Sequence, residues 1–202
     1  MTTNTIQPAL RSGGWSGFHR LYRVAAHRTL AQIKQHHADL VQSFRRLNES
    51  DSTIPSSYLS EYLEKLEAFI ALSASAQVFC AMSVEALLNL YGVVRLGEQF
   101  YKRNLERSGV VPKLEILLAT CDGILLPKDA ELSALLRKIS QKRNELVHPK
   151  SREFRVDRMD SANWPDELPK TVESAVTDME RFFELFAGLT EHINATTQFF
   201  DP

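Results

Sequence analysis

The sequence is poor in the residues that mark turn-rich and disulfide-bonded proteins. Eight glycines and eight prolines in 202 residues favour helices over a β protein built from short strands. The two cysteines, Cys80 and Cys121, are far apart and lack the spacing of metal ligands, so we expect buried thiols in a reducing cytosol. There is no internal repeat or low-complexity block, and the length suits one domain with a sizeable core.

Several catalytic motifs are missing as well. The chain has no glycine-rich phosphate loop, no Gly-x-Ser-x-Gly elbow, no His-Glu-x-x-His pair and no carboxylate cluster suited to Mg²⁺. These absences exclude most nucleotide-dependent and metal-dependent enzymes, so we expect neither a metal nor a cofactor. The N-terminus lacks the apolar core of a signal peptide, which predicts a cytoplasmic protein.

The formal net charge of −1 hides an uneven distribution. Residues 1–46 carry seven Lys or Arg against one Asp, and residues 137–158 carry eight against three acids. Two basic regions on a nearly neutral chain suggest a polyanionic partner such as RNA. The equally weighted alternative is that they face acidic segments of the same chain or of a second subunit.

Apolar residues recur at helical spacing and predict an all-α, up-and-down bundle of four to six helices. We expect a flexible arm over 1–17, a single helical domain over 18–196 and a frayed tail over 197–202. The sequence predicts two long helices over 18–48 and 56–92, followed by a short helix or irregular connector over 97–108. A short helix from Pro112 is closed by Gly123, and another helix follows Asp129. A charged loop over 150–170 then leads to a final helix capped by Thr171.

The second of these helices is unusually apolar, with Glu85 as the one charged side chain between Ala68 and Val94. Its length is borderline for a membrane span, but several Ser, Gln and Asn side chains would then lie in lipid. We therefore favour the central helix of a soluble bundle or a dimer interface. Glu85 and Asn89 share a face, and a buried carboxylate needs a cation. We hypothesise that this cation is Arg143.

The run from Arg143 to His148, followed by Pro149, is the most informative stretch of the chain. On a helix, Arg143 falls near the centre of an apolar arc, and Asn144 and His148 lie at one edge of it. The arc consists of Leu132, Leu135, Leu136, Ile139, Leu146 and Val147. A guanidinium on such a face is costly unless it meets an anion or a wet cleft. The proline forces the helix to end near Val147, which holds His148 at the helix end.

Arg143 and His148 are sufficient in principle for metal-independent RNA cleavage. An imidazole that titrates near neutral pH can act as general base and acid, and an arginine can hold a phosphate bidentately. The histidine would take the proton of a ribose 2′-OH, and the arginine would stabilise charge on the phosphoryl oxygens. The expected RNA-binding residues around this pair are Lys142, Lys150, Arg152 and Arg155.

The run Arg143-Asn144-x-x-x-His148, late in an all-helical domain, resembles the ribonuclease motif of the HEPN superfamily (higher eukaryotes and prokaryotes nucleotide-binding). In that motif an arginine precedes a histidine by four to six residues, often with a polar residue directly after the arginine. The likeness covers roughly residues 56–186, and Glu85 on the preceding long helix also fits. A second match, from Arg20 to His27, lies mid-helix and is interpreted as accidental.

The resemblance implies catalytic Arg143 and His148, with Asn144 orienting or polarising and with Glu85 and Asn89 in support. It also implies a homodimer whose two motifs share a cleft, a toxin or phage-defence setting, and an antitoxin protein as a candidate partner. Two other interpretations stay open. One is a catalytically silent helical domain that binds nucleic acid or a protein through the same cleft. The other is a plain bundle in which Arg143 and Glu85 neutralise each other.

Overall fold

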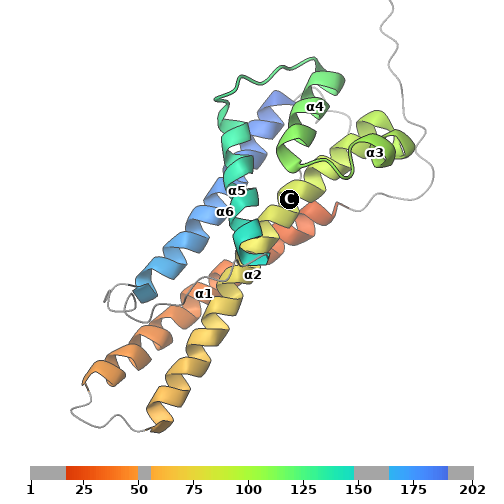
Figure 1. Ribbon diagram of the computed structural model, residues 1–202. Helices are drawn as coiled ribbons and strands as arrows, with labels where there is room; N and C mark the ends of the chain where they lie inside the picture. Colours follow the sequence, from red (N-terminus) through yellow and green to blue (C-terminus); the bar gives the residue numbers. More distant parts are fainter. Residues whose placement is uncertain (1–16, 50–55, 148–163, 191–202) are drawn as a thin grey trace, which may run out of the picture.

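The structure is a computed structural model that describes residues 17–49, 56–147 and 164–190. These residues form six α-helices and no strand (Figure 1), which confirms the predicted all-α bundle. The helices are α1 (Phe18–Glu49), α2 (Ser56–Leu96), α3 (Glu98–Asn104), α4 (Val110–Asp122), α5 (Glu131–Val147) and α6 (Trp164–Leu189). Residues 1–16 of the predicted arm over 1–17 and the whole tail over 197–202 lie outside the described residues.

Helices α1 and α2 form a long antiparallel hairpin that extends beyond the end of α5 (Figure 1). Two hydrogen bonds fix their alignment. Ser83 Oγ donates to the His19 carbonyl at 2.8 Å near one end, and Lys65 Nζ donates to Ser43 Oγ at 3.0 Å near the other. Helices α5 and α6 pack beside the half of the hairpin that contains the beginning of α1 and the end of α2. Helices α3 and α4 lie at the C-terminal end of α2.

Helix α2 is the centre of the bundle, because it packs against all five other described helices. Its fully buried side chains include Val84, Leu87 and Leu88, which together with Phe182 and Phe186 of α6 lie in the core. Within the described ranges, α2 is also the one helix long and apolar enough to cross a membrane. This is weak evidence for a span, because the central helix of a soluble bundle passes the same test.

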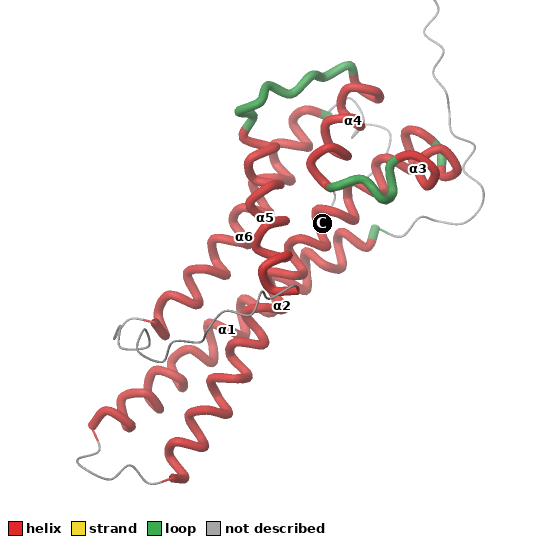
Figure 2. The backbone as a smooth tube through the Cα atoms, in the orientation of Figure 1, coloured by secondary structure: helices red, strands yellow, loops and turns green. Residues whose placement is uncertain are grey.

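Three glycines shape the α3–α4 end. Gly97 (φ 81°) separates α2 from α3, and Gly123 (φ 70°) ends α4 in the left-handed conformation that the sequence predicted for a closing glycine. Gly92 lets α3 approach α2, since a Cβ built there would lie 2.5 Å from the Tyr101 ring. The loops that follow α3 and α4 appear in green in Figure 2.

The predicted start of the last helix was wrong. We expected Thr171 to be its N-cap, but α6 begins at Trp164 and includes Pro169. Pro165 lies in the first turn of α6, where the missing N–H of proline costs nothing. The sequence left open whether residues 97–108 form a short helix or an irregular connector. This stretch contains the seven-residue helix α3.

Candidate functional site

Arg143 lies on the face of α5 that packs into the bundle. Leu132, Leu136 and Ile139 precede it on this face and are buried, and Arg143 itself is half-buried. The expectation of an arginine on the core face is therefore met. Leu146 and Val147 fall on the same arc by the helical period, but in the last turn of the helix they are 37% and 44% exposed.

The Arg143 guanidinium has an amide as its neighbour. Its Nη1 donates to Asn144 Oδ1 at 3.1 Å. No carboxylate of the described residues forms an ion pair with Arg143, and among those residues Asn144 is its side-chain hydrogen-bond acceptor. His148, Lys150, Arg152 and Arg155 lie outside the described residues, and their roles stay predictions.

The last turns of α5 lie against the middle of α2. Burial raises the pKa of the Cys80 thiol to about 12, and the positive charge of Lys142 partly opposes that shift. Lys142 is therefore near Cys80, and it is half-buried rather than open to solvent. The Cys80 thiol is protonated at neutral pH, which agrees with the expected buried thiol.

Asn89, which shares a face of α2 with Glu85, binds a cation other than the hypothesised Arg143. Lys113 of α4 is fully buried, and its Nζ donates to Asn89 Oδ1 at 2.8 Å and to the Glu106 carbonyl at 3.3 Å. Tyr101 OH donates to the same Asn89 oxygen at 2.5 Å. Asn89 therefore joins α2 to both α3 and α4.

Glu85 contributes a negative field to this cluster. Burial lowers the pKa of Lys113, and the negative charges of Glu85 and Glu106 oppose the shift. No ion pair links Glu85 to Arg143 in the part of the chain that the structure describes. The charge of Glu85 acts on Lys113 of α4, and Asn89 is bonded to Lys113 and Tyr101, whereas in the last turns of α5 the charge of Lys142 acts on Cys80.

Sequence reasoning did not identify Lys113, although a signal was present. Lys113 and Leu117 are four residues apart and so share the apolar face of α4. A cation in that position requires a buried acceptor, by the same argument that singled out Arg143. The difference is that Lys113 finds its acceptor within the chain.

Part of the basic surface of α1 is paired with carboxylates of α6. Arg23 holds the Glu180 carboxylate through two hydrogen bonds, one of them at 2.8 Å, and His27 Nε2 lies 2.7 Å from Glu180 Oε1. Lys34 Nζ lies 2.8 Å from Glu173 Oε1. The first basic region is thus partly paired with acids of the same chain. His27, part of the second Arg–His match, has a structural partner.

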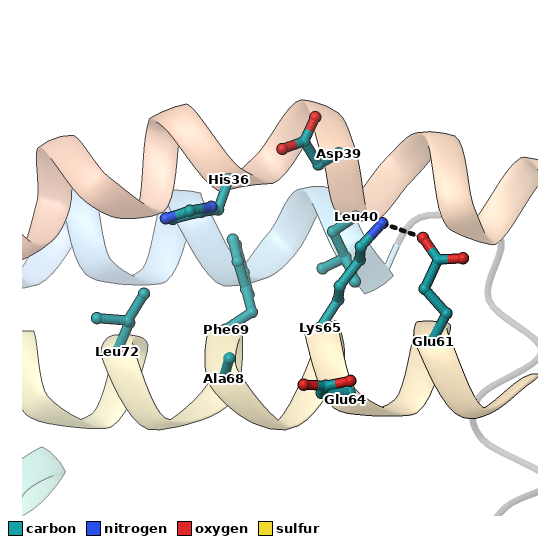
Figure 3. Close-up of a pocket in the computed structure, with 9 residues that line it drawn as sticks. All are labelled: His36, Asp39, Leu40, Glu61, Glu64, Lys65, Ala68, Phe69 and Leu72. Carbon is teal, nitrogen blue, oxygen red and sulfur yellow. Dashed lines mark hydrogen bonds and ion pairs between the residues drawn. The ribbon is translucent and has the colours of Figure 1, made fainter.

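A groove of about 350 Å³ lies between α1 and α2, on the part of the hairpin beyond α5 (Figure 3). Its floor is apolar, with Leu40, Phe69 and Leu72. Asp39, Glu61 and Glu64 line its edges, and Glu61 is paired with Lys65 at 2.5 Å. Carboxylates at these edges repel phosphate, so the groove is unsuited to RNA. Among the described residues, no group of three or more His, Cys, Asp or Glu side chains could hold a metal ion.

Comparisons with protein-family models, with curated proteins and with solved structures found no match to this chain. The likeness to the HEPN superfamily therefore depends on the motif at the end of α5 and on the helical architecture around it.

Proposed function

We propose that this protein is a metal-independent endoribonuclease of the HEPN type, with its active site at the end of α5. The observation that carries the proposal is the environment of Arg143. A half-buried arginine whose guanidinium lies beside an exposed amide and has no carboxylate partner among the described residues is suited to an anionic ligand.

The chemistry assigns one role to each residue of the motif. The His148 imidazole takes the proton from a ribose 2′-OH, and the 2′ oxygen attacks the adjacent phosphorus. The bond from phosphorus to the 5′ oxygen breaks, and the leaving oxygen receives a proton. Arg143 stabilises the negative charge that builds on the non-bridging oxygens, and Asn144 orients the guanidinium through its Oδ1. The products carry a 2′,3′-cyclic phosphate and a 5′-hydroxyl.

Incubation of the purified protein with end-labelled RNA in EDTA tests this proposal. We expect cleavage to products with 2′,3′-cyclic phosphate ends, and we expect His148→Ala and Arg143→Gln to abolish it. A substrate with 2′-deoxyribose at the cleavage position is the control, because it lacks the nucleophile. Cleavage that persists in His148→Ala, or that proceeds on the deoxy substrate, would contradict the mechanism.

The same geometry supports a second candidate, a silent domain that binds RNA without cutting it. Arg137 and Arg143 of α5 have no carboxylate partner among the described residues, so they favour phosphate binding with or without catalysis. Lys142, which the sequence also led us to expect at the RNA, is instead half-buried near Cys80. Intact RNA that binds with a steep salt dependence would support this candidate over the first.

The proposal includes a homodimer, with an antitoxin protein as a candidate partner. Leu146 and Val147 are exposed in the same turn as the candidate site, and neighbouring exposed apolar side chains favour a surface that a protein covers. Sedimentation equilibrium of wild type and of Leu146→Lys tests the dimer, since the charge would weaken an apolar contact. Equal molecular masses for the two proteins would show that this surface is not the interface.

A further inference from the structure

One exposed face of α5 extends from Asn144 of the candidate site toward the start of the helix. Arg137, Gln141 and Asn144 are spaced by four and three residues, so they line one face of the helix, and all three are exposed. Gln141 Nε2 donates to Glu145 Oε1 at 3.1 Å. The face therefore presents an arginine at one end and the amide bonded to Arg143 at the other.

The cations of α5 differ in how they are neutralised. Lys138 Nζ forms an ion pair with Asp178 Oδ2 at 2.7 Å. Arg137 has no carboxylate partner in the described parts of the chain. An exposed arginine with no carboxylate beside it in those parts can present its planar guanidinium bidentately to a phosphate.

Lys142 lies on another side of the helix. It precedes Asn144 by two residues, which turns it about 200° away from the face of Asn144. It is half-buried, and its charge acts on the buried Cys80 thiol. The closeness of Lys142 to the motif in sequence therefore does not place it on the face of Asn144.

We propose that Arg137 is a substrate-binding residue that holds a backbone phosphate of single-stranded RNA away from the scissile position. Arg137 and Asn144 are separated by roughly 10 Å along the helix, a span that an extended strand covers in about two nucleotides. This inference rests on the proposed function, and it extends the site along α5 by two turns. Gln141 lies between the two positions, where its Nε2 donates to the exposed Glu145 carboxylate and so offsets part of the repulsion between that carboxylate and a phosphate.

The test measures RNA binding separately from cleavage. The probe is a fluorescein-labelled single-stranded RNA with 2′-O-methyl groups throughout, which cannot be cut by the proposed mechanism. Fluorescence anisotropy in EDTA gives the Kd at several KCl concentrations for the full-length wild type, Arg137→Gln, Lys142→Gln and Arg143→Gln. Lys142→Gln is the matched control, because it removes the same charge from the same helix.

We expect Arg137→Gln to raise the Kd about 5- to 10-fold and to reduce the slope of log K against log [salt] by about 0.7 to 1. Lys142→Gln is expected to stay within about twofold of wild type. On cleavable RNA, Arg137→Gln should raise KM and leave kcat unchanged, because a remote phosphate is held equally in the ground and transition states. A purely structural role would not separate KM from kcat in this way.

Two results would overturn the inference, and they are distinguishable. If Arg143→Gln weakens binding while Arg137→Gln binds like wild type, Arg137 has no role and the proposed function survives. If wild type does not bind the RNA at all, the proposed function fails and the inference fails with it. A larger loss in Lys142→Gln than in Arg137→Gln would also overturn the assignment.

Discussion

Lys113 Nζ donates to Asn89 Oδ1 at 2.8 Å, and this contact fixes the α3–α4 end of the molecule to α2. The ammonium is fully buried and lies 5.7 Å from the centre of the Tyr101 ring, so its hydration is replaced by an amide, a carbonyl and an aromatic face. The cluster therefore explains why Glu85 and Asn89 interrupt an otherwise apolar stretch of α2. They compensate a buried cation from another helix.

Replacing Asn89 should lower the free energy of unfolding more than replacing Lys113 does. Asn89→Leu leaves the Lys113 charge buried with only the Glu106 carbonyl as acceptor, so we expect it to cost about 3–5 kcal/mol. Lys113→Met removes the charge itself and leaves Asn89 bonded to Tyr101, so we expect a cost of about 1–2 kcal/mol. Urea unfolding measures both. The double variant should be more stable than the sum of the two single effects predicts.

A result in which Lys113→Met is the more damaging single change would contradict this account. It would mean that the ammonium stabilises the fold through contacts other than its bond to Asn89.

The packing of α3 on α2 depends on the absence of a side chain at Gly92. A Cβ there would lie 2.5 Å from two atoms of the Tyr101 ring, which also donates to Asn89. Gly92→Ala should therefore cost about 1–3 kcal/mol through overpacking. Gly188→Ala in α6 is the matched control, because no atom lies within 4 Å of the Cβ position. Alanine there should be neutral or stabilise by up to about 1 kcal/mol.

Thermal unfolding of the two glycine variants gives the comparison directly. Equal melting temperatures for Gly92→Ala and wild type would show that α3 does not pack against α2 as closely as the structure has it.

Helix ends and glycine turns were the parts of the fold that the sequence predicted best. Gly123 ends α4 in the left-handed conformation, an effect that acts through the local backbone, and α5 ends at Val147, two residues before Pro149. The start of α6 was missed because Pro169 was interpreted as part of a loop, whereas the helix continues through it. Local rules predict which backbone conformations a proline excludes for its neighbours more reliably than they predict where a helix begins.

The partners of charged side chains were harder to predict than the helices. The sequence indicates that Glu85 and Arg143 each need a counter-charge, and it offers each as the partner of the other. The packing of α4 on α2 instead brings Lys113 to Asn89 and within the electrostatic field of Glu85, a tertiary arrangement with no local signature. Arg143 was correctly placed on the core-facing side of α5, since that follows from the helical period alone.

The Arg23–Glu180–His27 cluster should make the stability of the protein depend on pH. Burial alone would raise the pKa of Glu180, but its hydrogen bonds with Arg23 and His27 outweigh burial and lower it. A carboxylate with a lowered pKa in the folded state contributes stability above its unfolded pKa. That stability is lost as the pH falls through the folded pKa.

Thermal unfolding of wild type and Glu180→Gln between pH 7 and pH 3 measures this contribution. We expect the variant to be less stable at pH 7, with the difference shrinking as the solution becomes acidic. Glu184→Gln is the control, because Glu184 is exposed and its contact with Arg181 is 3.4 Å. A stability difference for Glu180→Gln that does not depend on pH would show that the carboxylate charge is not what stabilises the contact between α1 and α6.

Arg143 offers the sharpest separation between a structural and a functional role. Arg143→Lys keeps the positive charge but loses the planar fork that holds a phosphate bidentately, so we expect kcat for RNA cleavage to fall about 100-fold or more. Stability should change by less than about 1 kcal/mol, because the guanidinium has no carboxylate partner in the described residues and only Asn144 as a hydrogen-bond acceptor. Single-turnover cleavage in EDTA and urea unfolding of the same preparation measure the two quantities. A large loss of stability with unchanged cleavage would instead make Arg143 a structural residue of the bundle.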